Sequence, residues 1–425
     1  MKRWLSTTLA AIMLLTLCAG CGNKDGNGNT NKPGTSNPEP SGIYYEITGI
    51  DPNETVITVD GNEISAQVFF YWIAYNCSTV EFQMNMYKDY TGMYSEFINS
   101  DRTLKWDTQF TETETLSQYI KNESVETVKF YAVLENKAKE LGVVLTESDR
   151  AEMANKRKDD VERMGGEEEF KKYLAEMGVD EPTYERFSAS KYLFDNMNEL
   201  VLEEGSELYL PLEEYDQYAT YADHILLSTM NPKDNTKLPA DEISKKLAKA
   251  EELLAQLKAS DDVEALFNQL ADEFSEDTGR KTNPDGYIFK PGTMVEPFEN
   301  AAKTLKPGEI SDIVESEFGY HIILRKDLSK GLEAHPDQRK EVATSHLNAL
   351  LDKEMETVDM TISEKLNDID AGKFYTEYLA KIETMDVPAG MATEGENSDL
   401  SDVPSVDDAA DSANADAAGG DKPAA

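Results

Sequence analysis

The sequence has little cysteine, histidine and positive charge: its 425 residues include three cysteines, four histidines and 41 lysines and arginines, against 82 aspartates and glutamates. Three cysteines are too few for a disulfide framework or a cysteine-rich metal site, so we expect no metal and no cofactor. The formal net charge of −41 repels phosphates, which excludes nucleic acid as an expected partner. With so few histidines, His321 in the stretch FGYHIILRKD can be weighed individually, as a binding group or as an ordinary half-buried strand residue.

The N-terminus has the features of an export signal. Residues 1–20 combine a basic start, an apolar run from Leu9 to Leu17 and small residues before Cys21. This run is too short to span a bilayer as a mature helix. The Cys-Ala-Gly-Cys ending resembles a bacterial lipobox, which implies that Cys21 carries a palmitate-type lipid and anchors the mature chain at the extracytoplasmic face of the cell membrane. The alternative is plain secretion after cleavage near Ala19.

The segments next to both ends are expected to be flexible. Residues 21–42 contain no large apolar side chain that could bury surface and offset chain entropy, so we predict a polar tether. Residues 387–425 are acidic and rich in Ala, Ser and Gly, and we predict a disordered tail there. The sequence leaves the role of this acidity open.

Residues 43–210 have the pattern of a mainly helical region that follows a short hairpin. The hairpin is predicted at 55–65, where alternating residues flank an Asp-Gly turn. Thr146 followed by Asp149 indicates a capping box at the start of a helix. Farther along, Gly178 and Pro182 are expected to break two short helices.

Residues 335–386 are predicted to be helical again, with an amphipathic pattern from Asp337 to Asp370. Such a helix has an apolar face to bury. We therefore expect these C-terminal helices to pack on the N-terminal helical region, so that one domain is formed from both ends of the chain.

Between these parts, residues 218–328 predict an α+β domain with an antiparallel sheet. The expected strands are YATYADHILLST, EISDIVE and GYHIILRKD. The expected helices are ADEISKKLAKAEELLAQLK, DVEALFNQLADEFS and PFENAAKTL.

Four separated motifs in this region resemble the parvulin family of peptidyl-prolyl cis–trans isomerases. They are HILL at His224, LADEFSEDTG, GTMVEPFENAAKTLKPGEIS and VESEFGYHII. Because they occur in the family's order across the whole domain, the resemblance is more specific than any one motif. It implies paired catalytic histidines His224 and His321, a polar Asp277 facing the prolyl peptide and a supporting hydroxyl from Ser316. It also implies an apolar proline pocket, made by Met294, Phe298 and Phe289.

The chemistry of prolyl isomerisation is consistent with these residue types. Rotation about a peptide bond costs about 18–20 kcal/mol because amide resonance is lost. A site needs no covalent nucleophile or metal; it must bind the twisted amide better than the planar one. A thioether and an aromatic face suit a pyrrolidine ring. The paired histidines would then organise the site electrostatically rather than carry protons.

Each of these residues also has an ordinary structural explanation. Met294 and Phe298, four positions apart, fit a plain helical core, Asp277 a solvated turn, and either histidine a strand. Two positions depart from the family pattern: NPDGYIF replaces Gly-Gly-Asp-Leu-Gly, which puts Gly286 and Tyr287 at the pocket wall, and Asp223 replaces a common Ser. The loop 228–241 lacks the basic cluster needed to select phosphoserine-proline.

The helical region, with ITVDGNEISAQVFFYWIA near its start, resembles the chaperone domain of the SurA and PrsA foldases. With the lipobox, this resemblance implies a membrane-anchored foldase and chaperone whose partners are unfolded secreted proteins with X-Pro bonds. Whether it forms a homodimer is left open. One alternative is a holdase chaperone with an inactive parvulin domain. A second is a solute-binding lipoprotein, although that fold needs two lobes of repeating strand–helix units.

Overall fold

The computed structural model describes residues 40–234 and 236–385, which form two compact units. Unit 1 combines residues 40–197 with 349–385, and unit 2 contains the described residues of 198–348. The predicted signal, Cys21, almost all of the predicted tether and the acidic tail 387–425 lie outside the described residues.

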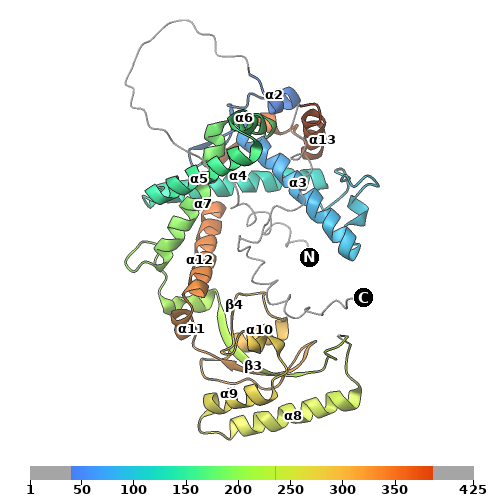
Figure 1. The fold of residues 1–425 in the computed structure, drawn as a ribbon, viewed down its shortest axis with the longest axis vertical. Coiled ribbons are helices and arrows are strands. Elements are labelled where there is room, and N and C mark those ends of the chain that lie inside the picture. The colour runs from blue at the N-terminus through green and yellow to red at the C-terminus, as the bar shows by residue number, and fades with distance from the viewer. Residues whose placement is uncertain (1–39, 235, 386–425) are drawn as a thin grey trace. The chain divides into compact units, whose positions relative to one another are not determined.

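Unit 1 is mainly helical and contains one small sheet (Figure 1). Its helices are α2 (Ile43–Thr48), α3 (Ala66–Thr91), α4 (Leu116–Glu140), α5 (Glu147–Met164), α6 (Glu167–Glu176) and α13 (Ala371–Ile382), with the short 3-10 turns η1 (Ser95–Phe97) and η4 (Glu364–Leu366). Its strands are β1 (Thr55–Val59), β2 (Asn62–Ser65) and β7 (Met360–Ile362). Two helices contain the points where the chain passes between the units, α7 (Glu181–Leu202) and α12 (Pro336–Thr357).

Local sequence signals explain several of these elements. The predicted hairpin is confirmed: β1 and β2 pair antiparallel around Asp60 and Gly61, whose φ angles of 46° and 80° match a type I′ turn. The capping box is also confirmed, since Thr146 accepts from the amide of Asp149 and Asp149 from that of Thr146.

Two predictions for the helices were wrong. Pro182 does not break a helix but lies in the first turn of α7, where its missing N–H costs no hydrogen bond. The amphipathic pattern from Asp337 to Asp370 is not one helix. It ends as α12 at Thr357, and β7 then pairs with β1, giving the strand order β2-β1-β7. A strand of three residues is too short to show the two-residue alternation that would distinguish it from the helical pattern around it.

An aromatic cluster holds the C-terminal helix α13 inside unit 1. Phe374 of α13 stacks on Phe70 of α3 with ring centroids 5.1 Å apart, and Tyr44 of α2 lies 5.6 Å from Phe374. Aromatic pairs at these distances stabilise beyond the area they bury. Segments from both ends of the chain thus share one core.

Unit 2 is α+β and contains a four-stranded antiparallel sheet in the order β4-β3-β6-β5, so the predicted fold class is confirmed. The strands are β3 (Thr220–Ser228), β4 (Tyr287–Phe289), β5 (Val314–Glu315) and β6 (Gly319–Arg325). The helices are α8 (Ala240–Lys258), α9 (Val263–Phe274), α10 (Glu296–Thr304) and α11 (Leu328–Ala334), with η2 (Leu212–Gln217) and η3 (Thr278–Lys281).

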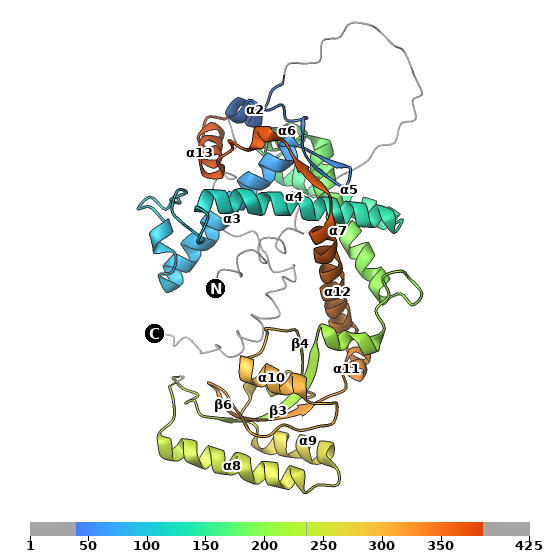
Figure 2. The same cartoon turned by 180° about the vertical axis from the view of Figure 1, so that it is seen from behind.

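The sheet of unit 2 separates two layers. Helices α8 and α9 lie on one side of β3 and β6, and α10 lies on the other, as Figures 1 and 2 both show. The α8/α9 side holds an apolar core whose members include Ile225, Leu253, Phe267 and Ile322. Residues of β6 alternate between the two sides, as the period of a strand requires.

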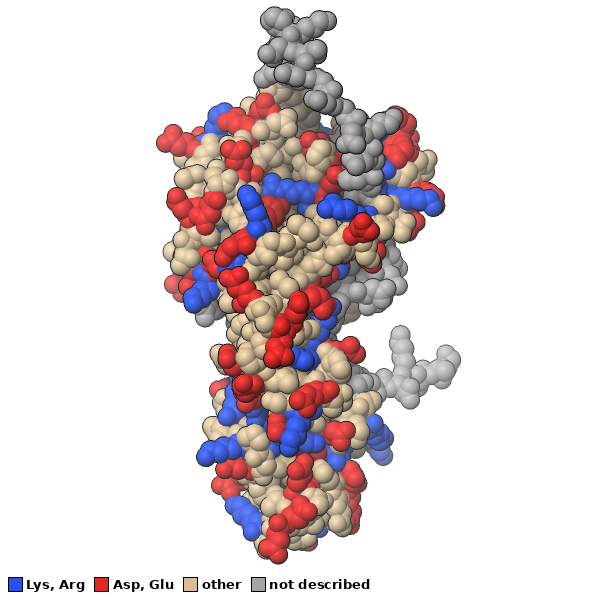
Figure 3. Space-filling view, turned by 90° about the vertical axis from the view of Figure 1, so that its left-hand side faces the viewer, with Lys and Arg blue, Asp and Glu red and all other residues tan. Residues whose placement is uncertain are grey.

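The surface carries charges of both signs. On the face shown in Figure 3, lysine and arginine side chains lie among aspartates and glutamates. Several cations are paired, such as Lys137 with Glu354 at 3.0 Å and Lys381 with Glu46 at 2.7 Å. Within the described residues, no helix combines the length and apolar character needed to cross a membrane.

Candidate active site

The two predicted histidines meet because of the register between β3 and β6. His224 lies opposite Ile323 and Leu226 lies opposite His321, so the histidines are diagonal neighbours on one face of the sheet. Their ring centroids are 5.3 Å apart. The register thus places side chains 97 positions apart in sequence side by side.

An apolar layer from α10 and β4 adjoins both histidines. The ring of Phe298 is steeply inclined to those of His224 and His321, at 87° and 71°, with centroids 5.1 and 5.5 Å apart, and Phe289 lies 5.9 Å from Phe298. Met294 packs on the same cluster and is half-buried. Phe298 and Phe289 are only 3% and 4% exposed, so they form the floor of this face and Met294 its rim.

Asp277 faces His224 at the other edge of this layer. It is the N-cap of η3, where Oδ1 accepts from the Gly279 amide at 3.1 Å, while Oδ2 accepts from the Tyr287 hydroxyl at 2.6 Å. Nε2 of His224 lies 3.1 Å from Oδ2, close enough for an ion pair but without the alignment of a hydrogen bond. Burial alone would raise the pKa of Asp277, but His224, Tyr287 and Gly279 together lower it to about 2. The carboxylate is therefore ionised at neutral pH.

His321 is held at the bottom of the face. It is 3% exposed, and its Nε2 lies 2.6 Å from the hydroxyl of Ser316, which is also buried. Burial, and to a smaller extent neighbouring His224, lower the pKa of His321 to about 3. The imidazole is therefore neutral at pH 7, and a cationic proton donor at this position is excluded.

The first departure from the parvulin pattern has a steric cause. Gly286 has a φ of 95°, and a Cβ built there would lie 2.7 Å from the Ala222 carbonyl oxygen and 2.8 Å from Cβ of Asp223. A leucine cannot occupy this position without moving β3. The close approach lets the next residue, Tyr287, pair with Ala222 and direct its hydroxyl to Asp277.

The second departure creates a buried ion pair that the sequence analysis missed. Asp223 is 2% exposed, and both of its oxygens accept from Arg280 Nη1 at 2.8 Å. Arg280 belongs to η3 and also donates to Asp272. A buried acid in a mainly apolar strand needs a partner of opposite charge. Asp223 therefore indicated an ion pair, but the sequence pattern could not identify the cation.

All seven predicted site residues of unit 2 lie on one face of the sheet. His224, Asp277 and Met294 are half-buried at its rim, whereas Phe289, Phe298, His321 and Ser316 are buried beneath them. Tyr287 joins the rim although it was not predicted as a functional residue. The arrangement offers an apolar surface next to one fixed negative charge.

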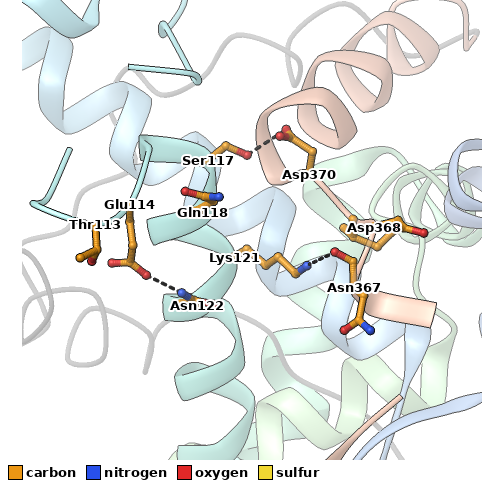
Figure 4. Close-up of a pocket in the computed structure, with 10 residues that line it drawn as sticks. Thr113, Glu114, Ser117, Gln118, Lys121, Asn122, Asn367, Asp368 and Asp370 are labelled. Carbon is orange, nitrogen blue, oxygen red and sulfur yellow. Dashed lines mark hydrogen bonds between the residues drawn. The ribbon is translucent and has the colours of Figure 1, made fainter. Parts of the chain in front are cut away.

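A separate pocket in unit 1 contains none of these residues. It has a volume of about 500 Å³ and is lined mainly by polar groups of α4, the segment before it and the segment before α13. As Figure 4 shows, its side chains bond to one another: Ser117 donates to Asp370 at 2.8 Å and Lys121 to the Asn367 carbonyl at 3.2 Å. These bonds fasten the C-terminal segment to α4.

Comparison with known proteins assigns the segment that carries the face. Residues 224–327 match the family described as "Rotamase: PPIC-type PPIASE domain". The "Foldase protein PrsA" of Geobacillus kaustophilus is 44% identical over 98 residues, which are 23% of this chain and 34% of that protein. The protein of the same name from Staphylococcus aureus (strain MRSA252) is 31% identical over 191 residues, 43% of this chain and 56% of that protein.

The chain thus spans between a third and about half of the length of these relatives. Among solved structures, the peptidylprolyl isomerase PrsA from Bacillus cereus is 22% identical and covers 64% of this chain and 98% of its own, with a TM-score of 0.25. The predicted resemblance is confirmed at the level of sequence: residues 224–327 are a PPIC-type, parvulin-family peptidyl-prolyl cis–trans isomerase domain in a chain similar to the PrsA foldases.

Proposed function

We propose that the chain isomerises X-Pro bonds of unfolded proteins on the α10 face of unit 2. The observation that supports this most is the convergence of His224, Asp277 and His321 on the apolar layer of Phe298, inside the segment that matches the isomerase family. A proline ring would rest beside Met294 at the half-buried rim. Asp277 would face the peptide bond.

The electrostatics of the face suit rotation of an amide. In the planar amide, resonance places negative charge on the carbonyl oxygen, and this charge decreases as the bond twists. A fixed carboxylate near that oxygen therefore opposes the planar state more than the twisted state, which lowers the barrier. Asp277 stays ionised and His321 stays neutral, so the step needs no proton transfer.

For the whole chain, the proposal is a membrane-anchored foldase that meets secreted proteins outside the cytoplasmic membrane. Its support is the lipobox-like sequence at Cys21 and the similarity to proteins named PrsA foldase. Labelling cells with a clickable palmitate should tag the wild-type chain, and Cys21→Ser should remove the tag. Equal tagging of both would rule out this anchor.

A second candidate, a holdase without isomerase activity, is favoured by exposed apolar side chains in unit 1. Phe82, Met86 and Tyr90 follow one another at four-residue spacing near the end of α3, Met93 follows the helix, and Tyr90 is 85% exposed. Such a surface could hold apolar segments of an unfolded chain. By contrast, both sheets are antiparallel among the described residues, which gives no support to a solute-binding fold.

The two candidates differ in one experiment on the full chain. A denatured client whose refolding is limited by one X-Pro bond is refolded with catalytic amounts of wild type or Met294→Ala, and client aggregation is measured in parallel. The isomerase should accelerate the slow phase, which otherwise takes tens of seconds or longer. Met294→Ala should reduce the acceleration while leaving aggregation suppressed.

The matched control is Leu254→Ala, which truncates another half-buried apolar side chain of unit 2, in α8 on the opposite side of the sheet. It should behave as the wild type. If the wild type suppresses aggregation but leaves the slow phase at its uncatalysed rate, the holdase is correct and the isomerase proposal fails.

A further inference from the structure

Tyr287 holds the ionised carboxylate of Asp277 on the α10 face. Its hydroxyl donates to Asp277 Oδ2 at 2.6 Å, while the Gly279 amide donates to Oδ1 at 3.1 Å. With both oxygens engaged from different elements, the carboxylate cannot rotate about its terminal torsion without losing a charge-assisted hydrogen bond. Burial, the hydrogen bond and the charge of Asp277 raise the pKa of Tyr287, so the phenol remains a donor.

Two glycines make room for this contact. A Cβ at Gly279 would lie 2.4 Å from the Tyr287 hydroxyl oxygen, and a Cβ at Gly286 would collide with β3. A side chain at either position would push the phenol or its strand away. The Tyr287–Asp277 bond and a leucine at position 286 are therefore mutually exclusive.

The loop that carries Asp277 is anchored to β3 a second time. Arg280, three residues after Asp277, forms the buried ion pair with Asp223, and Asp223 also accepts from the backbone amide of His224 at 2.7 Å. Both departures from the parvulin pattern thus act on the same short segment. Tyr287 fixes the carboxylate of Asp277, and the Asp223–Arg280 pair fixes η3, the turn that Asp277 caps.

We infer that Tyr287 is a positioning residue of the isomerase site, which holds the Asp277 carboxylate toward His224 and the substrate amide. The inference rests on the proposed function of the α10 face. Tyr287 acts through Asp277: without the phenol, the carboxylate can turn toward solvent, where its charge opposes the planar amide less. Gly286 and Tyr287 then replace the leucine wall of the parvulin pattern with a hydrogen-bonded wall, and the site is retained.

The test removes only the hydroxyl oxygen of Tyr287. Tyr287→Phe keeps the ring in the apolar layer and deletes the donor. It should lower kcat/KM for an X-Pro peptide about tenfold, the scale of a lost hydrogen bond to a charged group. It should also raise the pKa of the Asp277 carboxyl, measured by NMR titration of its carboxyl carbon. The other titratable groups near Asp277 are His224, His321 and the Arg280–Asp223 pair, and all of them are unchanged.

Two further variants separate positioning from general damage. Tyr221→Phe removes another phenol that donates to the Asp285 carbonyl of the adjacent loop, and it should change neither the rate nor the Asp277 pKa. In an Asp277→Ala background, Tyr287→Phe should have no further effect on the rate, because residues that act through one another are not additive.

The inference is overturned if Tyr287→Phe leaves the Asp277 pKa unchanged, or shifts it without slowing catalysis, or slows the Asp277→Ala protein by the same factor as the wild type. A wild type without isomerase activity would instead contradict the proposed function. In that case the titration of Asp277 still shows whether the phenol holds the carboxylate.

Discussion

The two faces of the sheet in unit 2 are built from alternate residues of the same strands, yet they differ in character. Toward α8 and α9, β6 contributes Tyr320, Ile322 and Leu324 to a large apolar core. Toward α10 it contributes His321 and Ile323, next to an ionised carboxylate. The α8/α9 face is mainly apolar, with the Asp223–Arg280 pair near its edge, whereas the α10 face keeps His224 and Asp277 half-buried.

This difference implies that the α8/α9 face mainly stabilises unit 2 and that the α10 face mainly supports activity. Burial of apolar area stabilises a domain in proportion to the area removed from water, and the α8/α9 face supplies it without restriction. The α10 face gives up part of that stabilisation to hold charges and hydrogen bonds in place. Changes on the first face should therefore lower stability, and changes on the second should lower activity.

The largest expected effect is a loss of stability on the α8/α9 face. Phe267 of α9 is fully buried there, and Phe267→Ala should lower the free energy of unfolding of unit 2 by about 3–5 kcal/mol. Hydrogen exchange of the β3 and β6 amides measures the change. Gln269→Ala, an exposed position in the same helix, should stay within about 0.5 kcal/mol. An equal loss in both variants would show that burial of Phe267 on the α8/α9 face does not determine the stability of unit 2.

The next effect is a loss of activity on the α10 face. Asp277→Asn keeps the shape of the side chain and removes its charge, and it should lower kcat/KM for an X-Pro peptide about 100-fold, as for other preorganised electrostatic groups. Asp312→Asn, which removes a charge from an 86% exposed side chain of the same unit, should leave the rate unchanged. A similar loss in both would mean that net charge, not placement, matters.

The smallest effect is a pH dependence of stability that arises mainly from the α10 face. The folded pKa of His321, about 3, lies below its ordinary value of 6.5, so the unfolded chain takes up this proton first. Stability is complete above pH 6.5 and falls on acidification by about 1.4 kcal/mol per pH unit, or about 2 kcal/mol by pH 5. Hydrogen exchange of β6 between pH 6.5 and 5 measures it.

His321→Asn should remove most of this slope and leave a smaller part from His346, whose pKa is also lowered by burial, whereas His335→Asn, at an exposed position, should retain the full slope. An unchanged slope in the His321 variant would show that another group is responsible and that His321 is not a buried neutral imidazole.

The same contrast explains what could be predicted from the sequence. The α8 and α9 helices and the strand β6 follow from apolar periodicity, which reports burial directly. The predicted set of His224, Asp277, Met294, Phe298 and His321 came from the resemblance, and the register of β3 and β6 brings them together. Their roles remain predictions.

Contacts between short elements could not be predicted. β4 has three residues and β7 has three, too few to show a period of two. The Asp223–Arg280 pair and the Tyr287–Asp277 bond depend on where η3 and β4 meet β3, which only the tertiary structure decides. The sequence showed that Gly286 and Tyr287 were unusual, but it could not show that they form a hydrogen-bonded wall.

The central claim is that the α10 face catalyses rotation about X-Pro bonds, and NMR exchange spectroscopy at equilibrium tests it most directly. An Ala-Pro peptide is mixed with a catalytic amount of the full chain, and cross-peaks between its cis and trans signals are recorded at mixing times below one second. Uncatalysed exchange takes tens of seconds and gives none. We expect cross-peaks with the wild type and a strong reduction with Asp277→Asn. Their absence with the wild type would contradict the central claim.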